Sequence, residues 1–536
     1  MLFDFIIRKL RFIGRNVKTH GIKGGGSAEN DNESADKLSS KLKDNLKDIQ
    51  ARMENSTDFK VNSFTLGDGE TSAALLFIDG LVDNLLVTNS VLRPLKQWQP
   101  KEEQSGGKLI DALDKQVICV AGAEKAKTLQ EVLTGYLSGN VVLLVDGYAQ
   151  ALILDTKGWE KRNITEPQSE TVVRGPREGF TEDLRTNTSL MRRKIRNEKL
   201  KSENMNIGRK TQTGVCLMYL EGVVNANALK EIKWRLKNLD VESILETGYI
   251  EEYIEDAPFS PFATMAYTEK PDVAAAKILE GRIAILVDGT PFALTAPMLF
   301  IESFQTAEDY YERPLYASLL RIIRYAGYTL TILAPAIYVA LMSFHHELIP
   351  TTLLFTVAKA REGTPFPVFF EALIMIFAFE LLREAGVRLP RPVGQAISIV
   401  GALIMGEAAV SAGLIGAPMV IVIAVTSVAG FLVPTQNESS SVLRVVAMIP
   451  AAVVGFYGVG LMCIGTLIHL ATLESFGVPF FDSFGQSGDS EDALIRKPLW
   501  SMAHRPQEIA EGDTTRIKPY IPPMRPHSKN DEGGQP

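Results

Sequence analysis

The sequence predicts an α/β cytoplasmic N-terminal domain made of two duplicated subdomains, followed by an α-helical polytopic membrane domain. Three observations predict this fold class. The composition changes near residue 312, a strand-and-turn pattern occurs twice, and long apolar runs fill residues 317–473. The mean hydropathy of the 536 residues is close to zero, because a charged half and an apolar half cancel in the average.

Residues 1–54 are expected to form an amphipathic and flexible N-terminal extension. The chain begins with the apolar-and-basic stretch "MLFDFIIRKLRFIGR". A signal peptide would place its basic residues first and end in a small-residue cleavage site, which this stretch does not. We interpret it either as a helix lying on a membrane surface or as a frayed helix without a partner. Without an export signal, the polar half is expected to stay in the cytoplasm.

The repeat lies in two stretches that share one spacing. "SGNVVLLVDG" is matched by "EGRIAILVDG", so that Gly139 corresponds to Gly281 and Gly147 to Gly289, 142 residues apart (281 − 139). An independent pair of stretches, around Gly80 and Gly222, gives the same spacing. Two matches at one spacing indicate a tandem duplication. The predicted subdomains are residues 55–170 and 211–312.

Near-continuous apolar strands such as "VVLLV" and "IAILV" are typical of sheets covered on both faces. The Asp-Gly pair that ends each of these strands could hold a catalytic carboxylate. A tight turn explains it better, since Gly permits a positive φ and Asp hydrogen-bonds nearby backbone. We find no phosphate-binding loop, no GxGxxG and no activated nucleophile, so the sequence predicts neither an enzyme nor a cofactor.

Other site types are also disfavoured by composition. The cysteines are too widely spaced to indicate a disulfide framework or a metal site, at Cys119, Cys216 and Cys463. A net charge of −7 gives no sign of nucleic-acid binding.

Residues 171–210 are predicted to be a basic connecting segment between the subdomains. Its positive residues are Arg174, Arg177, Arg185, Arg192, Arg193, Lys194 and Arg196. They could contact neighbouring subunits or anionic lipid headgroups. A solvated connecting helix is the alternative, because acidic residues are interleaved with the basic ones.

The apolar part, residues 313–473, is predicted to be the transmembrane domain, because a bilayer-crossing helix needs about 20 apolar residues. The predicted spans are residues 326–344, 365–382, 396–416, 418–433 and 442–471. The polar, Pro-rich residues 474–536 are expected to be a disordered tail.

Basic residues near the ends of the spans predict their orientation. Arginines precede the first span and follow the second, at Arg313, Arg321, Arg324, Arg383, Arg388 and Arg391. Both clusters favour the cytoplasm, so residues 345–364 are expected outside. Five full spans would then place the C-terminus outside, unless the glycine-interrupted fifth segment or residues 348–358 are re-entrant.

Charged residues inside a membrane usually face a pore, a cavity or a partner. The intramembrane polar candidates are Glu407, Glu371, Glu380 and Ser411. Glu371 and Glu380 lie on opposite faces of one helix, so at most one of them can line a pore. Glu407 lies among small residues that allow close helix packing, and it could form a carboxylate ring favouring cations. Alternatively, Glu407 pairs with a polar group of another helix.

Several long motifs resemble the A subunit of the GerA-type spore germinant receptors. They include "SETVVRGPREGFTEDLRTNTSLMRRKIRN", "PFALTAPMLFIESFQTAEDYYERP", "AREGTPFPVFFEALIMIFAFELLREAGVRLPRPVGQAISIVGALIMGEAAV" and "IHLATLESFGVP". The resemblance covers roughly residues 55 to 480.

This resemblance implies a multi-pass protein of the inner membrane of dormant bacterial spores, with a cytoplasmic C-terminus. It also implies a transporter-like B subunit that binds the nutrient, a lipoprotein C subunit, and a homo-oligomer, pentameric in the family, that conducts monovalent cations. A related spore membrane paralogue, a channel that amplifies ion release, has a similar pattern. A non-conducting scaffold or signal-transducing subunit is a further alternative. A transporter working alone is disfavoured, because the spans show no inverted repeat.

Overall fold

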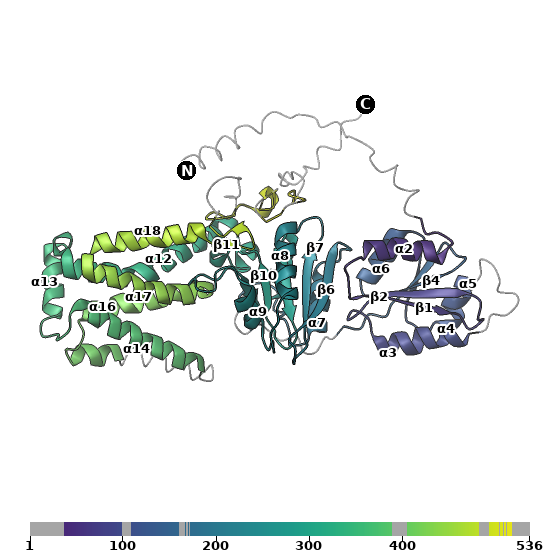
Figure 1. The fold of residues 1–536 in the computed structure, drawn as a ribbon, viewed down its shortest axis with the longest axis horizontal. Coiled ribbons are helices and arrows are strands. Elements are labelled where there is room, and N and C mark those ends of the chain that lie inside the picture. Colours follow the sequence, from purple (N-terminus) through teal and green to yellow (C-terminus); the bar gives the residue numbers. More distant parts are fainter. Residues whose placement is uncertain are drawn as a thin grey trace, which may run out of the picture.

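The computed structural model describes residues 37–98, 109–159, 167, 170, 172–388, 405–481, 492–502, 504–506, 509–510 and 512–516. The amphipathic helix predicted at residues 1–15 lies outside them. Figure 1 shows two α/β units followed by a bundle of helices. We call residues 37–159 the first unit and residues 180–296 the second unit.

The first unit is a five-stranded antiparallel sheet of order β1-β2-β4-β5-β3. Its strands are β1 (Phe59–Thr65), β2 (Ser72–Ile78), β3 (Ala123–Ala126), β4 (Val141–Val145) and β5 (Ala151–Leu154). One face is covered by α2 (Leu42–Arg52) and α6 (Leu129–Leu137). The other is covered by α3 (Asn84–Leu86), α4 (Arg93–Gln97) and α5 (Leu109–Ala112). Helices on both faces explain why β4 is buried throughout.

The second unit repeats this arrangement, with the strand order β6-β7-β9-β10-β8. Its strands are β6 (Leu200–Ile207), β7 (Thr213–Leu220), β8 (Ala266–Thr268), β9 (Ile283–Val287) and β10 (Ala293–Ala296). Its helices are α7 (Leu184–Lys194) and α10 (Pro271–Leu279) on one face, and α8 (Ala226–Lys237) and α9 (Thr247–Ile254) on the other. The matching strand orders confirm the predicted duplication.

The repeated Asp-Gly pairs have a structural role in both units. The Asp146 carboxylate accepts a hydrogen bond from the first amide of α2, at Leu42, at 2.8 Å. Asp288 accepts the equivalent bond from Leu184, the first residue of α7, at 3.1 Å. The glycine that follows each aspartate has a φ of 88°, a conformation that costs glycine little. The turn explanation of these residues therefore fits the geometry.

The structure places the domain boundaries differently from the sequence prediction. α2 belongs to the first unit, although we expected residues 1–54 to be an extension. α7 and β6 belong to the second unit, although we expected residues 171–210 to connect the units. Within that segment, Arg192 pairs with Asp58 of the first unit through Nε at 2.6 Å, and its side chain is 1% exposed. The segment therefore supplies the contact between the units.

The helical region begins with α11 (Glu308–Tyr311) and continues through α12 (Pro314–Phe344), α13 (Thr351–Ala360), α14 (Val368–Arg388), α16 (Ala417–Gly430), α17 (Asn437–Val454) and α18 (Phe456–Thr472). α12 packs against α14, α16, α17 and α18. It leads away from the two units, and α13 lies at its far end (Figure 1). Of the described helices, α12 alone is by itself long and apolar enough to cross a membrane.

The predicted spans correspond unevenly to these helices. The first two fall on α12 and α14. Of the third, residues 396–404 lie outside the described part and residues 405–411 are helical. The fourth is α16, which has 14 residues and is shorter than the ~20 that a straight crossing needs. α16 and residues 434–454 are bent by 113° at the break between them.

We expected residues 442–471 to be one glycine-interrupted segment that either crosses the membrane once or is re-entrant. It is divided into α17 and α18, which pack against each other. The division falls at Gly455, whose φ of 64° is one that L side chains rarely adopt. A Cβ there would lie 2.5 Å from the His345 ring. The chain consequently turns back at the far end and returns toward the second unit, where His469 meets Ser260 at 2.9 Å.

The expected disorder of residues 474–536 is also wrong for the described part of that range. Phe480, Ile509 and Ala510 are at most 1% exposed. β11 (Glu474–Ser475) and β12 (Val478–Pro479) form a small hairpin beside the second unit, where Ser475 Oγ donates to the Thr264 carbonyl at 2.7 Å. The C-terminal part of the chain therefore packs against the second unit.

Candidate functional site

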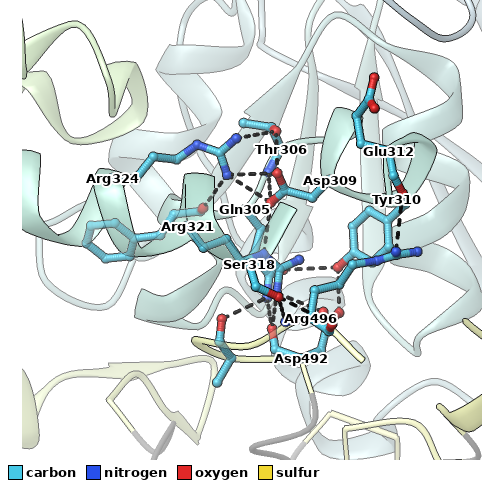
Figure 2. Close-up of polar contacts among 12 residues, drawn as sticks. Gln305, Thr306, Asp309, Tyr310, Glu312, Ser318, Arg321, Arg324, Asp492 and Arg496 are labelled. Atoms are coloured by element: carbon cyan, nitrogen blue, oxygen red, sulfur yellow. Dashed lines mark hydrogen bonds and ion pairs between the residues drawn. The ribbon is translucent and has the colours of Figure 1, made fainter. Parts of the chain in front are cut away.

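The base of α12 carries a buried polar cluster that connects three parts of the chain (Figure 2). We call it the junction cluster. We call the described residues between 492 and 516 the C-terminal segment. The cluster contains two residues each from α11, from the first turns of α12 and from the C-terminal segment. In that order they are Asp309, Tyr310, Arg321, Arg324, Asp492 and Arg496.

Asp309 is the centre of the junction cluster. Its carboxylate accepts from Arg321 Nε at 2.9 Å and from Arg324 at 2.8 and 2.9 Å. The side chains of Asp309 and Arg321 are 0% exposed. Both arginines reach one carboxylate because residues three apart lie on the same face of a helix. In the sequence they served as cytoplasmic charges that orient the first span, and the structure shows that both are paired.

The C-terminal segment joins the cluster through Asp492. Arg321 donates to the Asp492 carboxylate at 2.8 Å, and Tyr310 donates its hydroxyl to the same carboxylate at 2.6 Å. The guanidinium groups of Arg321 and Arg496 each lie 5.7 Å from the centre of the Tyr310 ring, within the range of cation–π attraction. The start of α12 is thus held by residues from both before and after the helical bundle.

The electrostatics keep Asp309 charged despite its burial. Burial by itself would raise the pKa of its carboxyl, but the hydrogen bonds from Arg324 and Arg321 outweigh this and the pKa is lowered. Burial, together with the nearby Asp492 carboxylate, raises the pKa of the Tyr310 hydroxyl well above its ordinary value. Tyr310 therefore remains a neutral hydrogen-bond donor.

A second buried group fixes the linker before α11 to the second unit. Glu302 lies in the short helix η4 (Phe300–Phe304) and pairs with Lys277 of α10 and with Arg282. The Glu302 and Arg282 side chains are each 3% exposed. Buried pairs are costly to break, because either partner alone would leave an uncompensated charge. Buried ion pairs thus join η4 to the second unit, and a separate group of them joins α11 to α12.

Two of the predicted intramembrane acids pair within the chain. Glu371 is 0% exposed, accepts from Arg361 at 2.9 Å and lies 3.3 Å from the Gly416 amide at the start of α16. Glu380 pairs with Arg444 of α17 at 2.9 Å. We expected one of the two to face a neighbour or a pore. In the described part of the chain both carboxylates pair within the subunit, Glu371 fully buried and Glu380 with a side chain that is 28% exposed.

Glu407 and Ser411 lie differently. Both are exposed on the helix of residues 405–411, four positions apart and hence on one face. No hydrogen bond or ion pair joins Glu407 to another described residue. The opposite face of this helix packs on α16, where a Cβ on Gly406 would come within 3.1 Å of Val420. The expected alternative, a polar partner for Glu407 in another helix, is not found among the described residues.

Sequence patterns alone do not define the junction cluster. The pattern offered one indication, since two arginines three residues apart at the start of an apolar helix favour a common acidic partner. That common partner is Asp309. The pattern could not identify the additional partner of Arg321, Asp492, because Asp492 lies beyond the whole bundle in sequence. Glu302 and Asp309 stood in a motif quoted for its resemblance, without an assigned role.

The apolar bundle, the duplicated α/β units and the junction between them define a membrane-associated protein with a large folded N-terminal region. The chain belongs to the family described as the Bacillus/Clostridium GerA spore germination proteins, whose model matches residues 47–508.

Individual relatives agree with this assignment. The chain is 43% identical to "Spore germination protein KA" of Bacillus subtilis (strain 168), over 89% of this chain and 88% of that protein. It is 40% identical to "Uncharacterized membrane protein YfkQ" of the same organism, over 89% of this chain and 93% of that protein.

One solved structure also matches. It is the crystal structure of the N-terminal domain of the A subunit of the Bacillus megaterium spore germinant receptor GerK3. The sequence identity is 36%, the match covers 49% of this chain and 97% of that one, and the TM-score is 0.40.

Proposed function

We propose that the chain is the membrane subunit of a nutrient germinant receptor that triggers spore germination, and that it oligomerises into a nutrient-gated ion channel. Family membership supports the role in germination. The exposed Glu407, on a helix face that the described residues of its own subunit leave uncovered, is the observation that supports conduction.

The proposed topology has six crossings. They are α12, α14, the segment containing residues 405–411, α16, α17 and α18. The hairpin at Gly455 supplies the sixth, so the chain ends on the side of the two α/β units, which we place in the cytoplasm. The proposed location is the inner membrane of the dormant spore. Residues 345–362 would then lie outside and Arg388 inside, as a cysteine-labelling scan from each side can test.

In the proposed oligomer, a pentamer, the helix of residues 405–411 from each subunit faces a common axis. Small residues beside Glu407 would permit close approach, and Ser411 would lie on the same face. Symmetry would then place one carboxylate per subunit in a ring that favours monovalent cations. The proposed partners are a transporter-like, nutrient-binding B subunit, a lipoprotein C subunit and membrane lipids.

The test is the Glu407→Gln variant in the reconstituted complex. It should lower cation conductance and selectivity while the complex still assembles, because each subunit loses a full charge where little water screens it. Glu371→Gln and Glu380→Gln are the comparisons. Since both acids pair with arginines inside the chain, these variants should weaken the fold and leave the selectivity of assembled channels unchanged.

Unaltered conductance and selectivity in the Glu407→Gln complex would refute the pore assignment. A chain that assembles, supports germination and never conducts would favour the alternative, a signal-transducing subunit. The junction cluster suits that alternative too, since it provides a rigid connection between the second unit and α12.

A further inference from the structure

The two units differ in how one corner of the sheet is covered. This corner lies beside the Gly80 and Gly139 turns in the first unit and beside the Gly222 and Gly281 turns in the second. In the first unit, the chain that leaves β5 folds back over this corner. Gly158 donates its amide to the Leu81 carbonyl at 3.1 Å, and the Asp83 amide donates to the Thr156 carbonyl at 2.9 Å. The ring of Trp159 reaches the Gly139 turn, where a Cβ would lie 3.2 Å from it. The first unit therefore closes this corner with its own next residues.

In the second unit, the corresponding residues after β10 lead away into η4 and α12. The C-terminal segment covers the corner in their place. At Gly281, the counterpart of Gly139, a Cβ would lie 3.2 Å from the Ile509 carbonyl and 3.3 Å from Ala510. Asp513 donates its amide to the Gly222 carbonyl at 3.0 Å. A segment from the far end of the chain thus replaces the missing return.

The C-terminal segment binds much as a peptide ligand does. It buries two small apolar side chains, Ile509 at 0% and Ala510 at 1% exposure. Arg505 fastens it to the end of α10 by donating to the Leu279 carbonyl at 2.9 Å. Within the segment, Arg505 also donates to the Thr515 carbonyl at 2.9 Å. Few buried contacts and little regular structure give a segment low local stability. Its other end carries Asp492 and Arg496 of the junction cluster.

We propose that the described residues 504–506, 509–510 and 512–516 form a detachable strap, and that the corner of the second unit at Gly222 and Gly281 is its docking surface. Docking completes the second unit and holds the C-terminal segment against the base of α12. Because the strap follows α18 in the chain, displacement of the helical bundle pulls on it. Release of the strap then exposes the corner of the second unit at Gly222 and Gly281. This inference does not depend on ion conduction.

The test measures thiol labelling of the full-length chain in membranes, in the Ala510→Cys, Cys463→Ser variant. Cys119 is exposed and serves as the accessible reference, and Cys216 is buried and reports that the second unit stays folded. With the strap docked, the thiol introduced at position 510 should react about tenfold or more slowly than Cys119. Equal rates at these two thiols would overturn the proposal.

A second substitution tests the docking contact. Adding Gly512→Ala places a Cβ 2.2 Å from the Gly222 carbonyl oxygen, so labelling at position 510 should rise about tenfold while Cys216 stays unreactive. Gly122→Ala is the matched control, since its Cβ would meet nothing closer than 3.7 Å. A strap that stays protected in the Gly512→Ala chain would contradict the proposed surface.

Detachability is tested by competition. An excess of a synthetic peptide of residues 498–516 should raise labelling at position 510 in the Ala510→Cys chain, because it takes the place of the strap. The same peptide carrying Gly512→Ala should not. If neither peptide changes the labelling rate, the segment is a fixed part of the fold and the proposal fails.

Discussion

The first and second units share a strand order and the hydrogen bonds that join Asp146 to α2 and Asp288 to α7, but their surroundings differ. The first unit contacts the second through the buried pair of Asp58 and Arg192 and through backbone hydrogen bonds around Ser202. The second unit contacts the helical region through Glu302 and the junction cluster, and its corner is covered by the C-terminal segment. The cores of the two units are alike, but their outer surfaces differ because those surfaces contact different parts of the chain.

The largest expected effect is at the junction cluster. Asp309→Ala would leave Arg321 and Arg324 buried without their shared carboxylate, which should cost about 3–5 kcal/mol of local stability. Hydrogen exchange over residues 300–324 would measure the loss. Glu312→Ala is the control, because it removes a nearby charge whose carboxylate makes no ion pair with a described residue. Equal exchange in both variants would show that the cluster does not hold α12.

The contact between the units should show a somewhat smaller effect. Asp58→Ala leaves Arg192, which is 1% exposed, unpaired, and should cost about 3 kcal/mol in the exchange of α7. Asp79→Ala removes the partner of Arg185, whose side chain is 49% exposed, and should change little, since exposed ion pairs contribute little. Similar losses in both variants would mean that burial does not decide the strength of this contact.

A third prediction concerns a carboxyl of the second unit near the helical region. Burial, with repulsion from Glu255, Glu438 and Glu246, raises the pKa of Glu251 to about 7. The folded state then holds a proton that the unfolded state releases, so stability falls as the pH rises from about 4.5 to 7. Glu251→Gln removes this penalty. The variant should be more stable than the original chain by about 1–2 kcal/mol at pH 8.

The same two chains should be equally stable at pH 4.5, where Glu251 is protonated in the folded protein. Thermal unfolding of the full-length chain in detergent at both pH values would test this. A stabilisation that does not change with pH would attribute the effect to packing instead of charge.

The smallest effect tests the duplication itself. Asp146→Ala and Asp288→Ala each remove the carboxylate that accepts from the first amide of a helix, and each should cost about 1 kcal/mol. Protection from hydrogen exchange should fall by similar amounts in α2 of the first variant and in α7 of the second. A loss in one unit alone would break the correspondence between them.

Local patterns in the sequence predicted the repeated cores. Runs of five apolar residues became strands buried on both faces, and glycines at a fixed spacing became turns with matching positive φ values at Gly147 and Gly289. The sequence also separated the polar half from the apolar half. These features depend on residues close together in the chain, which is why periodicity and composition suffice to recognise them.

Other features depended on contacts between distant residues. Glu371 and Glu380 pair with the arginine side chains that the folded bundle brings close to them. Arg444, the partner of Glu380 on α17, is far from it in sequence. A long apolar run containing glycines is compatible with one helix or two. The close approach of Gly455 to His345 shows why the chain turns there.

The sequence by itself determined two duplicated α/β units, an apolar helical region and the family to which the chain belongs. All three follow from local composition, residue spacing and motifs. Tertiary structure alone decided that α2 and α7 belong to the units, that α17 and α18 form a hairpin, and that the C-terminal segment returns to the second unit. The physical reason is common to these cases. Burial and charge pairing act between surfaces that meet in space, and the described part of the polar, Pro-rich C-terminal segment gains its order from the surface it covers.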